Sequence, residues 1–188
     1  MIIPISESLT VDPNEVYFID ANVLLFIHLN DKKRNQKTNK KIVYSRFVEY
    51  LQENGNSIFV STLNLQEVLH VVEKIEFDQY HQINPKTKFK QYRQNKYERH
   101  KLKQKLDEIL NQITQSYSIE DDSITKEDVE SFVSDFERHL YDPMDFFTVH
   151  LRCQPNSKFN YITDDSDFKN NNLFQTSSLI NLYTCTAV

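Results

Sequence analysis

The sequence has a single glycine, Gly55, among its 188 residues. Loops that wrap phosphate groups with backbone amides need several closely spaced glycines, so the Walker and dinucleotide-binding types are both excluded. The only glycine follows a segment of helical periodicity and is expected to end that helix. Scarce glycine therefore removes one large group of phosphate-binding proteins from consideration.

Cysteine is also scarce, and long apolar runs are missing. Cys153 and Cys185 are too few for a disulfide framework and are expected to be reduced thiols in a cytoplasmic protein. No segment approaches the roughly 20 apolar residues of a membrane span, so no membrane association is expected. Residues 1–15 lack the basic region and apolar run of a signal peptide.

Positive charge is concentrated in one segment. Residues 86–105 hold nine Lys and Arg against one acid, Glu98, in a chain whose net charge is −5. Three interpretations stay open: a solvated helix surface, a docking site for an acidic partner, or a surface that follows a nucleic-acid backbone. The third is supported by Phe89, Tyr92 and Tyr97, which lie between the cations and could stack on bases. Under this third interpretation, six basic residues are expected to contact the nucleic acid: Lys86, Lys88, Lys90, Arg93, Lys96 and Arg99.

Apolar runs of strand length alternate with segments of helical periodicity. Strands are predicted at residues 16–19, 57–61, 159–163 and 179–184. Helices are predicted over residues 23–29, 41–53, 62–75, about 125–140 and about 142–154. A further amphipathic helix is predicted in the later half of residues 78–117, where apolar residues recur at spacings of four, three and four: Leu102, Leu106, Ile109 and Ile113. This alternation predicts an α/β fold, a three-layer α/β/α sandwich around a mainly parallel sheet of four or five strands. One domain over residues 1–188 is expected, with a helical insertion at about 77–140.

Several helix starts can be assigned from polar residues. Asn22 is expected to cap the helix over residues 23–29, and Thr62 or Asn64 the helix that follows the second strand. Thr125 and Asp128 have the spacing of a capping box, which predicts another helix start.

Four acidic residues stand where packing favours apolar side chains. Asp20 ends the first strand, and Asp165 follows the third. Glu67 lies on an otherwise apolar helix face, and Asp145 in the first turn of an apolar helix. Because ligand sites form at the carboxyl ends of parallel strands, these acids are expected to converge. Crowded carboxylates repel one another, and Mg2+ or Mn2+ would relieve that repulsion and could activate water for phosphodiester hydrolysis.

Each acid also has a structural explanation. Asp20 could be a helix cap or an exposed strand end, and Glu67 could pair with Lys74. Asp145 in a first helical turn favours the helix dipole. The acids of residues 164–167 could form a solvated turn.

Four short motifs occur in a characteristic order: "FIDANVLLF", "STLNLQEVL", "DPMDFFTVH" and "YITDDSDF". Together they resemble the motifs of PIN-domain nucleases, a family that includes toxin-like ribonucleases. The resemblance covers residues 16–75 and about 142–183. It implies a set of catalytic acids that hold Mg2+ or Mn2+, with one further metal ligand and two supporting polar residues. The acids are Asp20, Glu67, Asp145 and Asp165, the further ligand is Asp167, and the supporting residues are Asn22 and Thr163; Asp164 is a less specific neighbour.

These features predict a metal-dependent endoribonuclease that hydrolyses single-stranded or structured RNA, with DNA less favoured. Two alternatives stay open. One is a nucleic-acid-binding or regulatory module that has the fold but does not cleave. The other is a toxin held by an antitoxin-like protein, although residues 77–140 are longer than compact toxin-like members need. The sequence also leaves a homodimer open.

Overall fold

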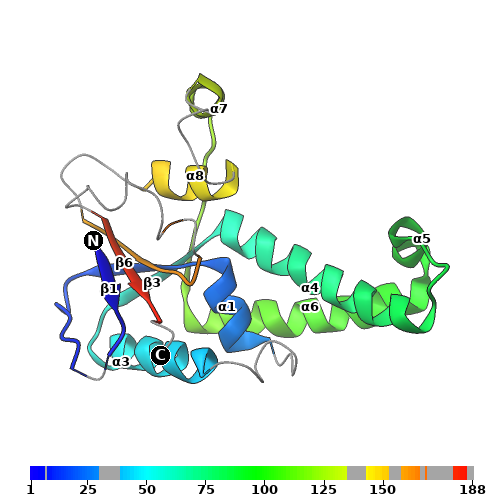
Figure 1. Ribbon diagram of the computed structural model, residues 1–188, viewed down its shortest axis with the longest axis horizontal. Helices are drawn as coiled ribbons and strands as arrows, with labels where there is room; N and C mark the ends of the chain where they lie inside the picture. Colours follow the sequence, from blue (N-terminus) through cyan, green and yellow to red (C-terminus); the bar gives the residue numbers. More distant parts are fainter. Residues whose placement is uncertain are drawn as a thin grey trace.

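The computed structural model describes residues 1–6, 8–29, 39–134, 143–152, 158–165, 168 and 180–185, and of residues 144, 145 and 149 the backbone alone. These residues form a sheet with helices on both faces (Figure 1). The strands are β1 (Ile2–Pro4), β2 (Val16–Ile19), β3 (Ser57–Ser61), β4 (Ser118–Glu120), β5 (Phe159–Ile162) and β6 (Ile180–Thr184). The helices are α1 (Ala21–His28), α3 (Lys40–Glu53), α4 (Thr62–Ile83), α5 (Phe89–Gln94), α6 (Lys96–Ser116), α7 (Lys126–Ser134) and α8 (Pro143–His150).

All strand pairs are parallel, in the order β1-β6-β5-β2-β3-β4. The α/β prediction is confirmed, but the described sheet has six strands, where four or five were expected. The additional strands, β1 and β4, have three residues each and lie at the two edges. Strands this short contain too few residues to show a two-residue alternation, so the sequence pattern missed them.

The sheet has a topological switch point between β2 and β5. From β2 the chain continues outward to β3 and β4, whereas β5 is followed by β6 on the other side. Where two such directions diverge, the loops at the carboxyl ends of neighbouring strands leave a crevice. The ends of β2 and β5 are therefore the expected place for a site.

Alternate side chains of the strands face two cores. Tyr17 and Ile19 of β2 belong to a core that contains buried residues of α1, α3 and α6. Phe18, between them, packs on the opposite face against Phe159 and Tyr161. In Figure 1, α1 and α3 lie on one side of the sheet and α8 on the other. Burial on both faces is typical of a parallel sheet.

Hydrogen bonds at the helix ends test the predicted caps. Gly55 ends α3 with a φ of 84°, and the amides of Gly55 and Asn56 donate to the carbonyls of Gln52 (3.1 Å) and Leu51 (2.9 Å). This is a Schellman motif, so the prediction for Gly55 is confirmed. The capping box before α7 is also confirmed (Thr125 N to Asp128 Oδ2, 2.8 Å; Asp128 N to Thr125 Oγ1, 3.2 Å).

Two other predicted caps are wrong. The helix α4 is capped by Ser61, whose Oγ accepts from the amide of Asn64 at 3.0 Å, and not by Thr62 or Asn64 themselves. The helix α1 begins at Ala21, so Asn22 lies inside its first turn. Helix α4 starts directly after the last residue of β3, and α1 follows β2 after the single residue Asp20.

Helices α4 and α6 run side by side and extend away from the sheet, with α5 at their far end (Figure 1). We call residues 69–107 the arm. Aromatic side chains hold α5 in place: Phe77 of α4 packs edge-on against Phe89 (centroids 4.8 Å apart) and Tyr92 (5.5 Å). Beyond the arm, Ile113 of α6 is fully buried in the main core. No helix among the described residues is long and apolar enough to cross a membrane.

Candidate active site

Asp20 lies at the carboxyl end of β2, where the chain turns directly into α1. Its amide donates to the carbonyl of Ile162 in β5 (3.0 Å), and its carbonyl accepts from the amides of Val23 and Leu24 (3.1 Å each). The residue is 4% exposed, and its side chain makes no capping hydrogen bond to α1. The explanation as an exposed strand end is therefore wrong. Asp20 does occupy the N-cap position of α1, but its side chain is not used as a cap.

Thr163 occupies the equivalent position at the end of β5. Its buried hydroxyl donates to Asp20 Oδ2 (2.6 Å) and accepts from the amide of Asp165 (3.0 Å). One hydroxyl group therefore fixes the carboxylate of Asp20 and the backbone of the turn that carries Asp165. Ile19 and Ile162 are partners in the parallel pairing of β2 and β5. The residues that follow them, Asp20 and Thr163, therefore lie next to each other.

The environment of Asp20 disfavours its negative charge. Burial raises the pKa of Asp20 to about 6, and the nearby charge of Asp165 adds to the increase. Hydrogen bonds from Thr163 and Tyr161 act in the opposite direction and lower the pKa. A hydroxyl group donates a hydrogen bond but brings no positive charge. A cation bound beside the carboxylates of Asp20 and Asp165 would therefore favour their charged forms.

Asp164 has a structural role beside this pair. Its carboxylate accepts from Lys40 Nζ (2.5 Å) and from the hydroxyl of Tyr44 (3.0 Å), both in α3. Its amide donates to Asn22 Oδ1 of α1 (3.2 Å). Asp164 and Asn22 thus hold the turn after β5 against the two helices, and this turn carries Asp165.

Asn64, which the sequence pattern indicates only as a possible helix cap, is a buried polar residue. Its side-chain nitrogen donates to the carbonyl of Ile19 (2.9 Å) and to the hydroxyl of Tyr161 (3.2 Å). Its side-chain oxygen accepts from the hydroxyl of Thr148 in α8 (3.4 Å). The signal in the sequence was its spacing, since Asn64 precedes Glu67 by one helical turn on the same face.

The structure gives less detail for the other three predicted acids, Glu67, Asp145 and Asp167. Glu67 is half-buried in α4, one turn beyond Asn64. Asp145 lies in the first turn of α8, one turn before Thr148, and only its backbone is described. Asp167 lies outside the described residues. Among the side chains that are described, no three His, Cys, Asp or Glu form a group that could hold a metal ion.

The six predicted nucleic-acid contacts all lie on the arm, from the turn after α4 to the start of α6. The aromatics between them are mostly unavailable for stacking, because Tyr92 is 2% exposed and Phe89 packs against Phe77. Tyr97 is the exception, with 75% of its surface exposed. Arg93 is also engaged: its guanidinium lies 4.3 Å from the centre of the Phe89 ring.

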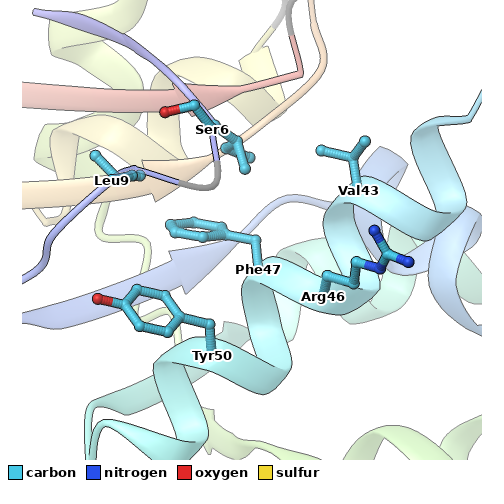
Figure 2. Close-up of a pocket in the computed structure, with 7 residues that line it drawn as sticks. Ser6, Leu9, Val43, Arg46, Phe47 and Tyr50 are labelled. Atoms are coloured by element: carbon cyan, nitrogen blue, oxygen red, sulfur yellow. The ribbon is translucent and has the colours of Figure 1, made fainter.

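An apolar pocket of about 340 Å³ lies elsewhere, between α3 and the segment after β1. Figure 2 shows Phe47 and Tyr50 of α3 pointing toward the segment that carries Ser6 and Leu9. None of the predicted acids lines this pocket.

The chain is similar to one in the crystal structure of VapBC2 from Rickettsia felis bound to a DNA fragment from the promoter. The TM-score is 0.50 and the identity 19%, and the alignment covers 90% of this chain and 98% of the other. At this identity the likeness shows the fold alone, which gives fold-level support to the PIN-domain resemblance. No protein-family model matches the sequence, and comparison with curated proteins gave no match.

Proposed function

We propose that the chain is a metal-dependent endoribonuclease with its active site at the carboxyl ends of β2 and β5. Asp20 carries the proposal, because it is a 4% exposed carboxylate beside a second acid, Asp165. It accepts hydrogen bonds from the hydroxyls of Thr163 and Tyr161 and from the backbone of Ala21, and none of these donors carries a charge. Leaving such a carboxylate without a positive counter-charge is unfavourable, so a bound cation explains its place in the fold.

The donor atoms fit a hard divalent cation. Mg2+ and Mn2+ prefer carboxylate oxygens, and Mg2+ needs only one or two of them because it keeps several waters. We assign Asp20, Glu67, Asp145 and Asp165 as the acidic ligands, with Asp167 as a further ligand. A metal ion held there would supply a water of lowered pKa and stabilise negative charge on the reacting phosphate.

The protein's own contribution is to hold these acids in place. Thr163 fixes the orientation of the Asp20 carboxylate, while Asn22 anchors the turn that carries Asp165. Asn64 ties α4, and so the helix of Glu67, to the end of β2. Mutation of residues that orient metal ligands typically costs 10–100-fold in metal affinity or activity.

Cleavage of end-labelled single-stranded RNA tests the proposal. We expect the wild type to cleave in Mn2+ or Mg2+ and to stop in a chelator. The Asp20→Asn variant should lose more than about 100-fold of the rate, because it removes a ligand itself and not a residue that orients one. Asp78→Asn, the same change at an exposed position of α4, should cleave like the wild type.

Two outcomes would count against the nuclease. Equal cleavage by Asp20→Asn would assign the activity to another site or to a contaminant. Folded wild-type protein that binds RNA but cleaves it in neither metal would favour the non-cleaving module. A thermal-shift measurement separates metal binding from chemistry, since Mn2+ should raise the Tm of the wild type and not that of Asp20→Asn.

A toxin held by a partner is the second candidate, favoured by the structural likeness. VapBC2 is a toxin–antitoxin complex, and its VapC component is a PIN-domain nuclease. We infer that an antitoxin-like protein binds this chain and restrains cleavage. A small protein encoded beside it should co-purify with the tagged chain and suppress its ribonuclease activity; separate elution with unchanged cleavage would argue against this arrangement.

A further inference from the structure

Some cations of the arm are part of its internal structure. Lys101 and Lys105 of α6 both pair with Glu76 of α4, a residue only 6% exposed. Arg93 of α5 donates two hydrogen bonds to Glu73 of α4, at 2.8 and 2.5 Å. These three cations hold α5 and α6 against α4, and a buried acid needs such partners. They are not free to bind a ligand without loosening the arm.

A second set of cations faces outward. Lys96, Arg99 and Lys103 are exposed and follow one another at spacings of three and four residues, which places them on one side of α6. At 1.5 Å per residue this row is about 10 Å long. The three residues line an open hollow on the arm together with His100, Gln94 and the edge of Arg93.

One of the three cations in this row has an acidic partner within salt-bridge distance among the described residues, and Glu73 also acts electrostatically on Arg99. Glu73 is already bound by Arg93, and Asp107 pairs with Lys103 on the exposed surface. Lys96 and Arg99 make no ion pair with any residue that the structure describes. Like charges at this spacing on one helix face repel each other, so a bound polyanion would relieve the repulsion.

Helix α4 connects the arm with the candidate active site, because Asn64 near its start donates to the carbonyl of Ile19 at the end of β2. Glu67 and His70 are three residues apart in α4, as are His70 and Glu73, so the members of each pair are neighbours on its surface. The groove between α4 and α6 is lined by two cations of the row, by polar and acidic side chains, and by four leucines: Arg99, Lys103, His70, Glu73, Asp107, Leu69, Leu102, Leu106 and Leu110. The six residues from Glu67 to Glu73 rise about 9 Å, the length of roughly three stacked nucleotides at 3.4 Å each.

The chemistry of the hollow favours a nucleic acid over a protein partner. The core of a protein–protein interface is depleted of charged residues and rich in apolar ones, whereas every residue that lines this hollow is polar or charged.

We infer that the row Lys96, Arg99 and Lys103 binds the phosphate backbone of a nucleic acid. The same strand continues along α4 to the Asp20 site, and this part of the inference rests on the proposed function. Compared with the sequence-based assignment, Arg93 becomes a structural residue and Lys103 joins the binding surface. The row would therefore select substrates longer than the few nucleotides that the catalytic acids contact.

Fluorescence anisotropy with the full chain in a chelator tests binding without requiring cleavage. The probes are a fluorescein-labelled 16-nucleotide RNA and the DNA of the same sequence. The variant Lys96→Gln/Arg99→Gln/Lys103→Gln should lose at least about tenfold in affinity and flatten the slope of log affinity against log salt by about 2, at about 0.7 per phosphate contact. The matched control, Arg46→Gln/Lys126→Gln/Lys158→Gln, removes three exposed cations outside the arm and should bind within about twofold of the wild type.

Loss of RNA binding, DNA binding or both in the arm variant alone supports the inference, because the contact is to phosphate. Unchanged RNA and DNA binding by the arm variant would overturn the inference, and so would an equal loss of binding by the control variant. It would also be overturned if the arm variant lost binding to polyglutamate but kept binding to RNA.

A kinetic experiment tests the link to the Asp20 site. If the protein cleaves RNA, the arm variant should have a lower kcat/KM than the wild type for the 16-mer but not for a dinucleotide. An equal decrease for both would overturn the link to the Asp20 site, and cleavage by no protein would refute the proposed function while leaving the binding result intact.

Discussion

Asp20 binds its proton more tightly in the folded chain than in the unfolded chain, because burial raises its pKa from 3.8 to about 6. Below about pH 4 the group is protonated in both states. Between about pH 4 and 6 the folded state holds more protons, so the contribution of Asp20 to stability falls as the pH rises through this window. Above it the full cost of the buried charge is present, on the order of 2–3 kcal/mol.

This linkage predicts how Asp20→Asn changes the metal-free protein. The amide carries no charge, so in a chelator at pH 8 the variant should have a higher free energy of unfolding than the wild type, by up to about 2 kcal/mol. At pH 5 the gain should shrink to about half, since the wild-type carboxyl is then largely protonated. Urea unfolding at both pH values measures the two gains. Equal gains at pH 5 and pH 8 would contradict a raised pKa.

At the scale of single elements, the end of α3 depends on one backbone conformation. Gly55 has a φ of 84°, and a Cβ added there would have no atom within 4 Å. The cost of Gly55→Ala is therefore a backbone cost alone, about 1 kcal/mol in the free energy of unfolding. Asn tolerates this conformation better, so Gly55→Asn should cost less than Gly55→Ala in urea unfolding. Equal stability of Gly55→Ala and the wild type would show that the Schellman motif does not form in solution.

In the arm, the sequence pattern predicts where a helix lies, but it does not predict which of the charged side chains have a structural role. Helical spacing located the apolar face of α6, and Leu102, Ile109 and Ile113 are indeed buried. The same pattern could not distinguish Lys105 from Lys103, because the partner of Lys105 is Glu76, 29 residues earlier in the chain. Which cation is structural depends on how α4 and α6 pack together, and no local pattern contains that information.

At the scale of the whole molecule, one buried ion pair connects three parts of the fold. Arg152, after α8, pairs with Asp122, after β4, and their side chains are 5% and 1% exposed. Asp122 also accepts from the amide of Leu63 at the start of α4 (2.8 Å). The guanidinium of Arg152 lies 4.9 Å from the ring centre of Phe18 in β2. The pair therefore holds α8, which carries Asp145, close to α4.

Breaking this pair should destabilise the protein strongly. Arg152→Met leaves the Asp122 carboxylate buried without its positive partner, which should cost about 3–5 kcal/mol in the free energy of unfolding. Adding Asp122→Asn removes the stranded charge and keeps an oxygen for the amide of Leu63, so the double variant should recover part of the loss. Urea unfolding of the two variants and the wild type checks both statements. A double variant less stable than Arg152→Met would mean that the Asp122 charge has another partner.

The sequence by itself determined the central strands, most helices, the parallel sheet and the identity of the candidate acids. Those features follow from local periodicity, and from the rule that parallel strands present their carboxyl ends at one edge. The tertiary structure decided that β1 and β4 form the sheet edges, that Asn64 bridges β2, β5 and α8, and that Asp164 pairs with Lys40. Each of these depends on contacts between segments far apart in the chain. Such contacts form only when the helices and strands have packed, so no window of the sequence can contain them.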